Sequence, residues 1–535
     1  MKKVFNLFVI TCIVAGMAAL NGCKEKEEIP VVTTAATTAI TTTTATTGGE
    51  VTSDGGAEVT ARGVCWGTST GPDITGSHTS DGTGVGVFTS NLTGLTPGTT
   101  YYVRAYATNS EGTAYGNEVT FSTTPIAGAT VTTTAVTGQT TTSAMSGGNV
   151  TADGGAPVTA KGVCWGPNAN PDITGSHTTD GTGLGAFTSE ITGLNPGQTY
   201  HVRAYATNSS GTTYGSDVTF TTLAAKPAVV TGTVSERTGV SAIVGGNVTG
   251  DGGAEILERG ICWSLSPGPD IDDNNVAAAT AGTGTFTCEI TGLDVYTTYY
   301  ARAYARNSAG IEYGADVMFT TLLVDFDGNV YTAVTIGDQV WMLENLAVTH
   351  YNDGTEIPNV TTPGAWTALT DGAFCWYNND MATNKPLYGA MYNWFAVNSG
   401  NLCPAGWHVP TDEDFQILEI ELGMTEADAD LFGWRGTDQG AQLKSTSGWS
   451  YNGNGTNTSG FTAVPGGVRY YEDGGFFGAG ELAYFWSSEE ANAERSYYRR
   501  VRSRTLVGSD YVTEERVDRE RAVKTAGKSV RCIKD

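Results

Sequence analysis

The chain has 535 residues, which is enough for several domains. Its formal charge of −26 at pH 7 argues against a nucleic-acid partner, because phosphates require a basic surface. Only 16% of the residues are charged, whereas the chain holds 71 glycines and long threonine-rich stretches. Since threonine favours strands and glycine favours turns, this composition predicts a mostly β protein.

The first residues have the pattern of a secretory targeting segment. Lys2 and Lys3 precede an apolar run, which ends in the sequence LNGC at Cys23. This sequence resembles the bacterial lipobox, and the resemblance implies that residues 1–22 are a signal peptide and that Cys23 becomes the lipidated N-terminus. An ordinary signal peptide followed by a coincidental cysteine is the alternative.

Residues 23–30 form a short charged tether. The sequence KEKEE at 24–28 resembles the tag that sends Bacteroidota lipoproteins to the outer face of the cell, although a solvated tether has a similar composition. Several acyl chains on one residue hold a protein stably on a membrane. The resemblance therefore implies an outer-membrane lipoprotein exposed on the cell surface.

Three internal repeats follow. The sequence YYVRAYATNSEGTAYG begins at Tyr101 and returns in close variants at Tyr200 and Tyr299, and GVCWG also recurs once per repeat. This periodicity predicts three copies of one structural unit. The units span residues 31–125, 126–224 and 225–322.

A threonine-rich segment at the start of the first repeat has two interpretations. Residues 33–47 could be a mucin-like stalk. The equivalent segment of the third repeat, which contains Val240, Ile243 and Val244, is not of low complexity. We therefore interpret residues 33–47 as part of two paired strands.

Alternation assigns faces to the strands. In the segment from Tyr101, the side chains of Tyr101, Val103 and Ala105 share one face. A tyrosine at the start of such a strand, after a Pro-Gly turn, resembles the tyrosine corner of immunoglobulin-like sandwiches. Each unit thus resembles a fibronectin type III domain. In the third repeat, Asp294 to Tyr296 replace the Pro-Gly turn, so the corner is less secure there.

Each repeat carries one cysteine beside a tryptophan: Cys65, Cys164 and Cys262. A single cysteine cannot form a disulfide within its own repeat, so we interpret these residues as small buried hydrophobic groups. The third repeat has an additional Cys288. A Cys262–Cys288 disulfide is an open alternative in an oxidising compartment.

The composition changes at about Val324, beyond which eight of the eleven tryptophans lie. The sequences LYGAMYNWFAV, LCPAGWHVPTDEDFQIL, GFTAVPGGVRYYEDGGF and YFWSSEE then follow in order. Residues 324–535 resemble the Fibrobacter succinogenes major paralogous (FISUMP) domain of surface lipoproteins. The resemblance implies an α+β fold of the C-type-lectin-like kind, and no general activity is established for the family.

The segment NLCPAGWHVPTDEDF predicts the entry to a helix. Thr411 is a suitable N-cap, and the acids at 412–414 suit the positive end of the helix dipole. An apolar stripe then continues to about Gly423. We expect His408 to lie at an edge or to make a structural hydrogen bond, with a catalytic or metal-binding role as the alternatives.

We predict no metal, no cofactor and no catalytic residue. The chain holds five histidines, and it lacks both HExxH and a close Cys/His cluster. The calcium-binding signatures of lectins, EPN or QPD and WND, are also missing. Glu356 to Asn359 differ from EPN by one additional residue, and Trp486 is followed by two serines instead of Asn-Asp. Hydrolysis by paired carboxylates stays an alternative, because carboxylate separations cannot be derived from sequence.

The lectin-like resemblance implies a disulfide between Cys403 and Cys532, and the alternative is two buried thiols. Cys375 is left unpaired. The best candidates for ligand binding are Trp376, Tyr388, Trp394 and Trp486, which lie among Asn, Gly and Ser and could stack on sugar rings. Core packing is the alternative for each of them. The locally basic run 495–505 is interpreted as a solvated strand face, with a polyanion-binding patch as the alternative.

Together these observations predict a mostly β, multidomain protein of three immunoglobulin/fibronectin III-like sandwiches and an α+β lectin-like domain. The sandwiches act as a spacer that holds the last domain away from the membrane. The leading functional hypothesis is non-catalytic binding or adhesion, with a carbohydrate as one candidate ligand. A surface scaffold that binds another protein is the second hypothesis, and a glycan-active enzyme is the third.

Overall fold

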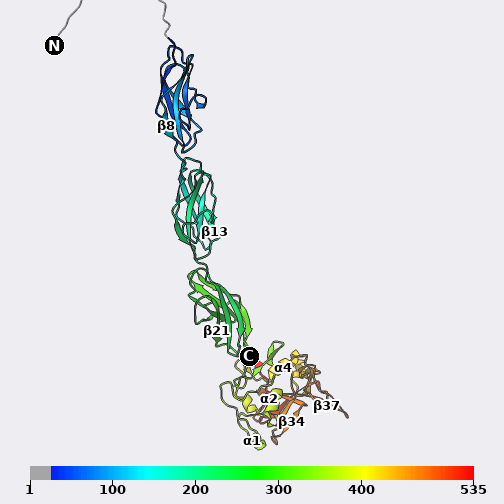
Figure 1. Cartoon of the computed structure of the whole chain (residues 1–535). Helices are drawn as coiled ribbons and strands as arrows, with labels where there is room; N and C mark the ends of the chain where they lie inside the picture. The colour runs from blue at the N-terminus through cyan, green and yellow to red at the C-terminus, as the bar shows by residue number, and fades with distance from the viewer. Residues whose placement is uncertain (1–25) are drawn as a thin grey trace, which may run out of the picture. The chain divides into compact units, whose positions relative to one another are not determined.

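The computed structural model describes residues 26–535 and is mostly β (Figure 1). The signal peptide and Cys23 lie outside the described residues. The chain divides after Leu223 into two compact units, of which the first holds the first two repeats and the second holds the third repeat and the C-terminal domain. No helix within residues 26–535 has the length and apolar character needed to cross a membrane.

Each repeat consists of a three-stranded and a five-stranded antiparallel sheet. In the first repeat the strands are β1 (Val31–Thr34), β2 (Ala45–Ser53) and β5 (Gly86–Leu92) in one sheet, and β3 (Ala61–Gly67), β4 (Ser77–His78), β6 (Thr100–Asn109), β7 (Gly112–Tyr115) and β8 (Val119–Ser122) in the other. Two facing sheets with alternating inward side chains make a sandwich.

The same arrangement recurs twice. The second repeat holds β9 (Thr130–Thr133), β10 (Ser143–Ala152), β11 (Ala160–Gly166), β12 (Ser176–His177), β13 (Gly185–Thr192), β14 (Thr199–Asn208), β15 (Gly211–Tyr214) and β16 (Val218–Thr221). The third holds β17 (Ala228–Ser235), β18 (Ser241–Gly250), β19 (Glu258–Ser264), β20 (Asn274–Ala277), β21 (Gly284–Thr291), β22 (Thr298–Asn307), β23 (Gly310–Tyr313) and β24 (Val317–Thr320). The three sandwiches expected from the repeats are therefore confirmed.

The threonine-rich segment belongs to two paired strands, as expected. Strands β1 and β2 run antiparallel, with Thr33 opposite Glu50 and Thr34 opposite Gly49. The Thr47 hydroxyl donates a hydrogen bond to the Ala35 carbonyl at 3.0 Å. Threonines in this segment therefore help to tie the edge of the first sandwich.

The predicted inward face is buried, and the tyrosine corner forms in all three repeats. Tyr101, Val103 and Ala105 belong to the core of the first sandwich. The Tyr101 hydroxyl accepts a hydrogen bond from the Thr96 N–H at 2.8 Å. The equivalent tyrosine of the third repeat, Tyr299, accepts from the Asp294 N–H at 3.0 Å, so the altered turn there leaves the corner intact.

The altered turn is explained by a contact within the second unit. Tyr296 has a φ of 49°, at the position where the first repeat has Gly98 with a φ of 64°. A side chain in this conformation is strained, but the Tyr296 ring packs edge-on against Trp407 with centroids 5.5 Å apart. Lys534 Nζ also donates a hydrogen bond to the Tyr296 carbonyl at 3.0 Å. Tyr296 therefore joins the third repeat to the C-terminal domain.

The cysteines of the repeats are buried free thiols. Cys262 and Cys288 do not form the disulfide that was left open. In the first repeat, Thr79 and Ser90 donate hydrogen bonds to the half-buried Asp81 carboxylate. The third repeat has Val276, Ala278 and Cys288 at these three positions, so Cys288 belongs to an apolar replacement of a polar cluster.

The C-terminal domain contains several small sheets. Its strands are β25 (Leu323–Val324), β26 (Val330–Tyr331), β27 (Ala333–Ile336), β28 (Gln339–Met342), β29 (Phe374–Cys375), β30 (Met391–Tyr392), β31 (Trp407–His408), β32 (Gly433–Arg435), β33 (Gly466–Arg469), β34 (Phe476–Ala479), β35 (Leu482–Glu490), β36 (Arg495–Arg502), β37 (Arg504–Val507), β38 (Asp510–Thr513), β39 (Val517–Val523) and β40 (Ile533–Lys534). The two main sheets have the orders β27-β28-β40-β31 and β32-β39-β36-β35.

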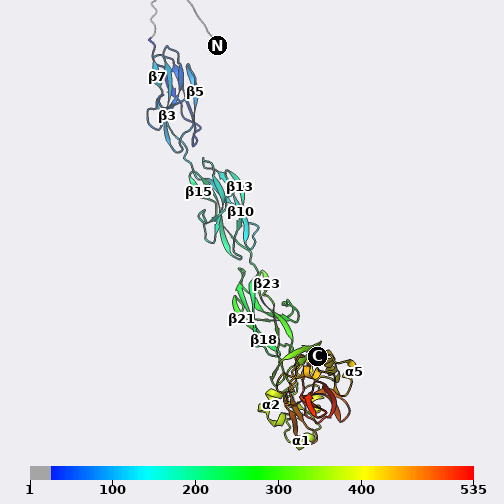
Figure 2. The ribbon, with the colours of Figure 1, turned by 90° about the vertical axis from the view of Figure 1, so that its right-hand side faces the viewer.

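Short helices surround these sheets, as Figure 2 shows for α1, α2 and α5. The helices are α1 (Pro363–Thr367), the 3₁₀ helix η1 (Tyr377–Asn379), α2 (Met381–Tyr388), α3 (Trp394–Val397), α4 (Asp412–Glu421), α5 (Glu426–Ala429) and α6 (Gln439–Leu443). Thr411 is the N-cap of helix α4 and forms a reciprocal capping box with Asp414. It ends two residues before the predicted Gly423.

A disulfide between Cys403 and Cys532 joins the segment before α4 to the end of the chain, with Cα atoms 6.0 Å apart. Cys375 is a buried free thiol, as expected. The bridge lies in the larger of the hydrophobic cores of this domain, where Trp486 and Tyr392 are also buried.

A network of buried ion pairs fixes α4 against the sheet of β32 and β36. Arg499 donates to Asp412 Oδ1 at 2.5 Å and to Glu419 Oε1 at 2.8 Å. Arg435 also pairs with Glu419, and Arg519 pairs with Asp412. The run 495–505 is thus only partly the solvated face that the sequence predicts, because Arg499 is 2% exposed.

Candidate functional site

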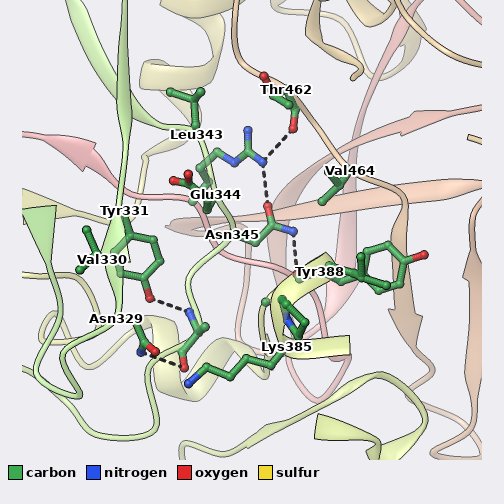
Figure 3. Close-up of a pocket in the computed structure, with 15 residues that line it drawn as sticks. Asn329, Val330, Tyr331, Leu343, Glu344, Asn345, Lys385, Tyr388, Thr462 and Val464 are labelled. Carbon is green, nitrogen blue, oxygen red and sulfur yellow. Dashed lines mark hydrogen bonds between the residues drawn. The ribbon is translucent and has the colours of Figure 1, made fainter. Parts of the chain in front are cut away.

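The C-terminal domain contains a cavity of about 500 Å³ (Figure 3). Its walls come from five stretches that are distant in sequence: the start of β26, the chain that follows β28, the end of α2, the segment before β33, and the segment before β40. The lining residues that the argument below uses are Asn329, Tyr331, Glu344, Asn345, Lys385, Tyr388, Val464 and Arg531. This is within the size range of sites that hold small molecules.

Local sequence explains how α2 delivers one wall. The Asp380 carboxylate caps the helix by accepting a hydrogen bond from the Thr383 N–H at 3.2 Å. The helix ends at Gly389, which has a φ of 68°. A Cβ at Gly389 would lie 2.7 Å from the carbonyl oxygens of Asn345 and Leu346. Glycine is therefore needed for α2 to end so close to the chain after β28.

Asn345 connects this wall to Arg531. Its Nδ2 donates to the Tyr388 carbonyl at 2.8 Å, and its Oδ1 accepts from Arg531 Nη2 at 3.0 Å (Figure 3). Arg531 also donates to the carbonyls of Phe461 and Thr462. Burial lowers the pKa of the Arg531 guanidinium to about 9. The cavity thus has a positive group in its wall.

Tyr331 and Asn329 form the opposite wall and are held by one buried carboxylate. The Tyr331 hydroxyl donates to Asp325 Oδ2 at 2.5 Å. It also accepts from the Ala347 N–H at 3.0 Å, which is the bond drawn at Tyr331 in Figure 3. The Asn329 amide donates to the same carboxylate oxygen at 2.7 Å. Burial, with Asp325 nearby, raises the pKa of Tyr331 well above its usual range. These hydrogen bonds fix the positions of Tyr331 and Asn329, and they place the buried Asp325 carboxylate directly behind this wall.

Two further charged side chains line the cavity. Glu344 is exposed, and its carboxylate accepts hydrogen bonds from the Thr332 N–H at 2.8 Å and hydroxyl at 2.7 Å. Lys385 is half-buried, with Nζ 5.8 Å from the centroid of the Trp376 ring. Glu344 is the one carboxylate among the residues that line this cavity.

Of the four aromatic candidates, only Tyr388 lies at this site. Trp376, Trp394 and Trp486 are 3%, 2% and 0% exposed and belong to the hydrophobic core. Trp486 also donates its indole N–H to the Tyr392 carbonyl at 2.9 Å. These three rings are not available for stacking on an external ligand, because their faces are covered by core side chains; core packing was the alternative interpretation.

A second aromatic surface lies on the hairpin of β33 and β34. Tyr470 is 42% exposed and Phe477 is 64% exposed, and both line a hollow of about 370 Å³ together with Asp473. The sequence YYEDGGFF carries a signal for this surface, since acids and glycines mark the tip of a turn and the flanking aromatic residues then face solvent.

His408 makes structural hydrogen bonds on β31. Its Nδ1 lies 2.6 Å from Asp535 Oδ1, and its Nε2 lies 3.2 Å from Asp414 Oδ2. The hydrogen bond with Asp414, aided by Asp535, raises the pKa of His408 above its usual value. Across residues 26–535, no three His, Cys, Asp or Glu side chains are arranged to hold a metal ion.

We expect His408 to make the stability of the C-terminal domain depend on pH. Because folding raises the pKa of this histidine, its contribution is complete below the unfolded-state pKa of about 6.5 and is lost as pH rises through the folded-state value. Urea unfolding between pH 5.5 and 8.5 measures this. The free energy of unfolding of the wild-type protein should exceed that of His408→Gln by about 0.5–1 kcal/mol at pH 5.5, which is within the range of exposed ion pairs. The difference should be smaller at pH 8.5. A difference that grows with pH would contradict the assignment.

Comparison with known proteins supports part of the expected organisation. Residues 334–534 match the family model of the Fibrobacter succinogenes major domain, which confirms the resemblance over that segment. No curated protein matches the chain. Among solved structures, the crystal structure of chicken CNTN1 FN1-FN3 domains matches with 15% identity over 54% of this chain and 98% of its own, at a TM-score of 0.17.

Proposed function

We propose that this is a non-catalytic binding protein of the cell surface, whose C-terminal domain holds a carbohydrate in the cavity beside α2. The observation that carries the proposal is the cavity itself. It is about 500 Å³ in volume and combines apolar walls with a few fixed polar groups, as ligand sites commonly do. Asn345 and Tyr331 are held by hydrogen bonds, so the site is formed before a ligand enters.

The number of carboxylates that line the cavity supports binding rather than hydrolysis. Glycoside hydrolases generally use two carboxyl groups, roughly 5–10 Å apart, on either side of the scissile bond. This cavity has one carboxylate, Glu344, and both of its oxygens accept hydrogen bonds from Thr332. A glycan-active enzyme therefore stays a weaker alternative.

The attachment to a membrane is part of the same proposal. The sequence at Cys23 and the charged tether support a lipid-anchored, surface-exposed protein of the outer membrane. The disulfide between Cys403 and Cys532 fits a compartment where thiols are oxidised. It is also the bridge that a lectin-like fold implies, and it supports that assignment for the C-terminal domain.

A glycan array probed with the soluble mature chain, with Cys23 replaced by serine, tests the proposal. We expect a defined set of glycans to bind and the signal to fall at least tenfold in Val464→Trp, because Val464 lines the cavity and a larger side chain fills it. Val512→Trp is the matched control, since Val512 is exposed on β38. Glycan binding that survives Val464→Trp would place the ligand elsewhere.

The second candidate function is a scaffold that binds another surface protein, and the aromatic hairpin favours it. Exposed Tyr470 and Phe477 form an apolar surface of the kind that protein interfaces use. Partner capture lost in Phe477→Ser, with glycan binding unchanged, would support this alternative. Release of a product from a polysaccharide, lost in Glu344→Gln, would instead support an enzyme.

A further inference from the structure

We propose that the cavity selects acidic saccharides, which are sugars that carry a carboxylate or a sulfate ester. This inference rests on the proposed function and adds the charge of the ligand to it. The charges that line the cavity carry the argument. Lys385 and Arg531 are positive and Glu344 is negative, so the residues that line the cavity have a net charge of +1. The Asp325 carboxylate lies behind this lining, where both of its oxygens accept hydrogen bonds from Asn329 or Tyr331. Such a positive cavity contrasts with the charge of −26 on the whole chain.

Arg531 is a buried cation whose hydrogen-bond acceptors are neutral. Its side chain is 0% exposed, and the acceptors around it are two carbonyls and the Asn345 amide. Its Nε is buried without a hydrogen-bond partner among the described residues. Arg435 and Arg499 in the same domain differ, because each pairs with a carboxylate. The positive charge of Arg531 therefore has no carboxylate in direct contact with it in this low-dielectric wall.

Glu344 offsets the charge of Arg531 in part, because its field opposes the effect of burial on the guanidinium, but it does not contact that group. Its carboxylate accepts hydrogen bonds from the two donors of Thr332, and no ion pair joins it to Lys385 or Arg531 in the described part of the chain. The Glu344 carboxylate is also exposed, where water screens its field.

Lys385 supplies the charge that a ligand can contact directly. It is half-buried at the end of α2, and Nζ makes neither a hydrogen bond nor an ion pair among residues 26–535. The ammonium group therefore has free donors at the cavity. Arg531 has no solvent-accessible surface, so a ligand responds to its field rather than to its N–H groups. A single negative charge on the ligand matches this arrangement.

Titration calorimetry with the soluble mature chain tests the inference. The probes are galactotriose, a trisaccharide in which one galactose is replaced by galacturonic acid, the methyl ester of that acid, and a singly sulfated galactotriose. We expect the acidic probes to bind at least tenfold more tightly than the neutral ones and to weaken as salt rises from 20 to 300 mM. A preference for the carboxylate or for the sulfate identifies the natural acidic group, and either preference supports the inference.

Three variants separate charge from shape. Lys385→Gln should weaken binding of the acidic probe by about five- to tenfold, which corresponds to about 1–1.4 kcal/mol. Glu344→Gln should strengthen it by about two- to fivefold, a change of opposite sign that a folding defect would not produce. Arg495→Gln is the matched control, because Arg495 is an exposed cation on β36.

The outcomes distinguish this inference from the proposed function. Equal affinity for neutral and acidic probes, with no response to Lys385→Gln or Glu344→Gln, overturns the charge selection and leaves carbohydrate binding intact. If no saccharide on the array or in the calorimeter binds, the proposed function itself fails. Tighter binding of the acidic probe to Lys385→Gln would also overturn the inference.

Discussion

Replacing Arg499 with methionine is expected to lower the free energy of unfolding of the C-terminal domain by about 3–5 kcal/mol, the usual cost of breaking a buried ion pair. Arg499 bridges Asp412 and Glu419, and its removal leaves both carboxylates with less positive charge nearby. Burial alone would raise the pKa of Asp412, but Arg499 and Arg519 hold it below its usual value. Urea unfolding followed by tryptophan fluorescence measures the loss.

Arg495→Met is the control for this substitution, because Arg495 lies on the same strand but is exposed. It should change the unfolding free energy by less than about 0.5 kcal/mol, as surface substitutions usually do. A second test adds Glu419→Met to Arg499→Met. The two effects should not be additive, since both residues belong to one network. Additive losses, or a loss from Arg499→Met no larger than the control, would contradict the role of the network.

Removing the disulfide between Cys403 and Cys532 is also expected to lower the free energy of unfolding of the C-terminal domain by several kcal/mol. The bridge closes a loop with a sequence separation of 129 residues. In the loop-entropy account, a loop of this length contributes about 5 kcal/mol by restricting the unfolded chain. The double variant Cys403→Ala with Cys532→Ala should therefore lower the midpoint of thermal unfolding of the domain strongly, and dithiothreitol should do the same to the wild-type protein.

Cys375→Ala provides the control for the loss of a buried sulfur. Cys375 is buried and free, so this variant loses only packing and should cost about 1 kcal/mol. The midpoint of the double variant should not respond to dithiothreitol. If the double variant were as stable as Cys375→Ala, the bridge would contribute little to this fold.

Much of the fold was predictable because the repeats can be compared with one another. The third repeat identified the threonine-rich segment as strands, and alternation placed Tyr101 and Val103 in the core. The capping box of Thr411 and Asp414 was visible because it depends on residues three positions apart. The conformation of the turn at Tyr296 could not be predicted from the sequence. The ring that offsets its strained backbone belongs to Trp407, which is far away in the chain.

The candidate site was predicted less well for a related reason. Tyr388 was identified, but the sequence does not show whether a tryptophan among small polar residues lies on a surface or in a core. Trp376, Trp394 and Trp486 are all in the core. Lys385 and Arg531 gave no signal, because their importance depends on which acids are close in space. The basic run 495–505 was misread in part for the same reason: the partners of Arg499 lie on α4.

The cluster of Thr79, Asp81 and Ser90 limits how the repeats can exchange residues. Two hydroxyl groups hold one carboxylate there, and the second repeat holds Asp180 in the same manner with Thr178 and Ser189. Grafting only the cysteine of the third repeat into either of these sandwiches would leave the carboxylate with one donor fewer. Grafting only the aspartate into the third repeat would set a charge beside valine and a thiol. The residues at these three positions therefore have to be exchanged together if a sandwich is to keep a satisfied core.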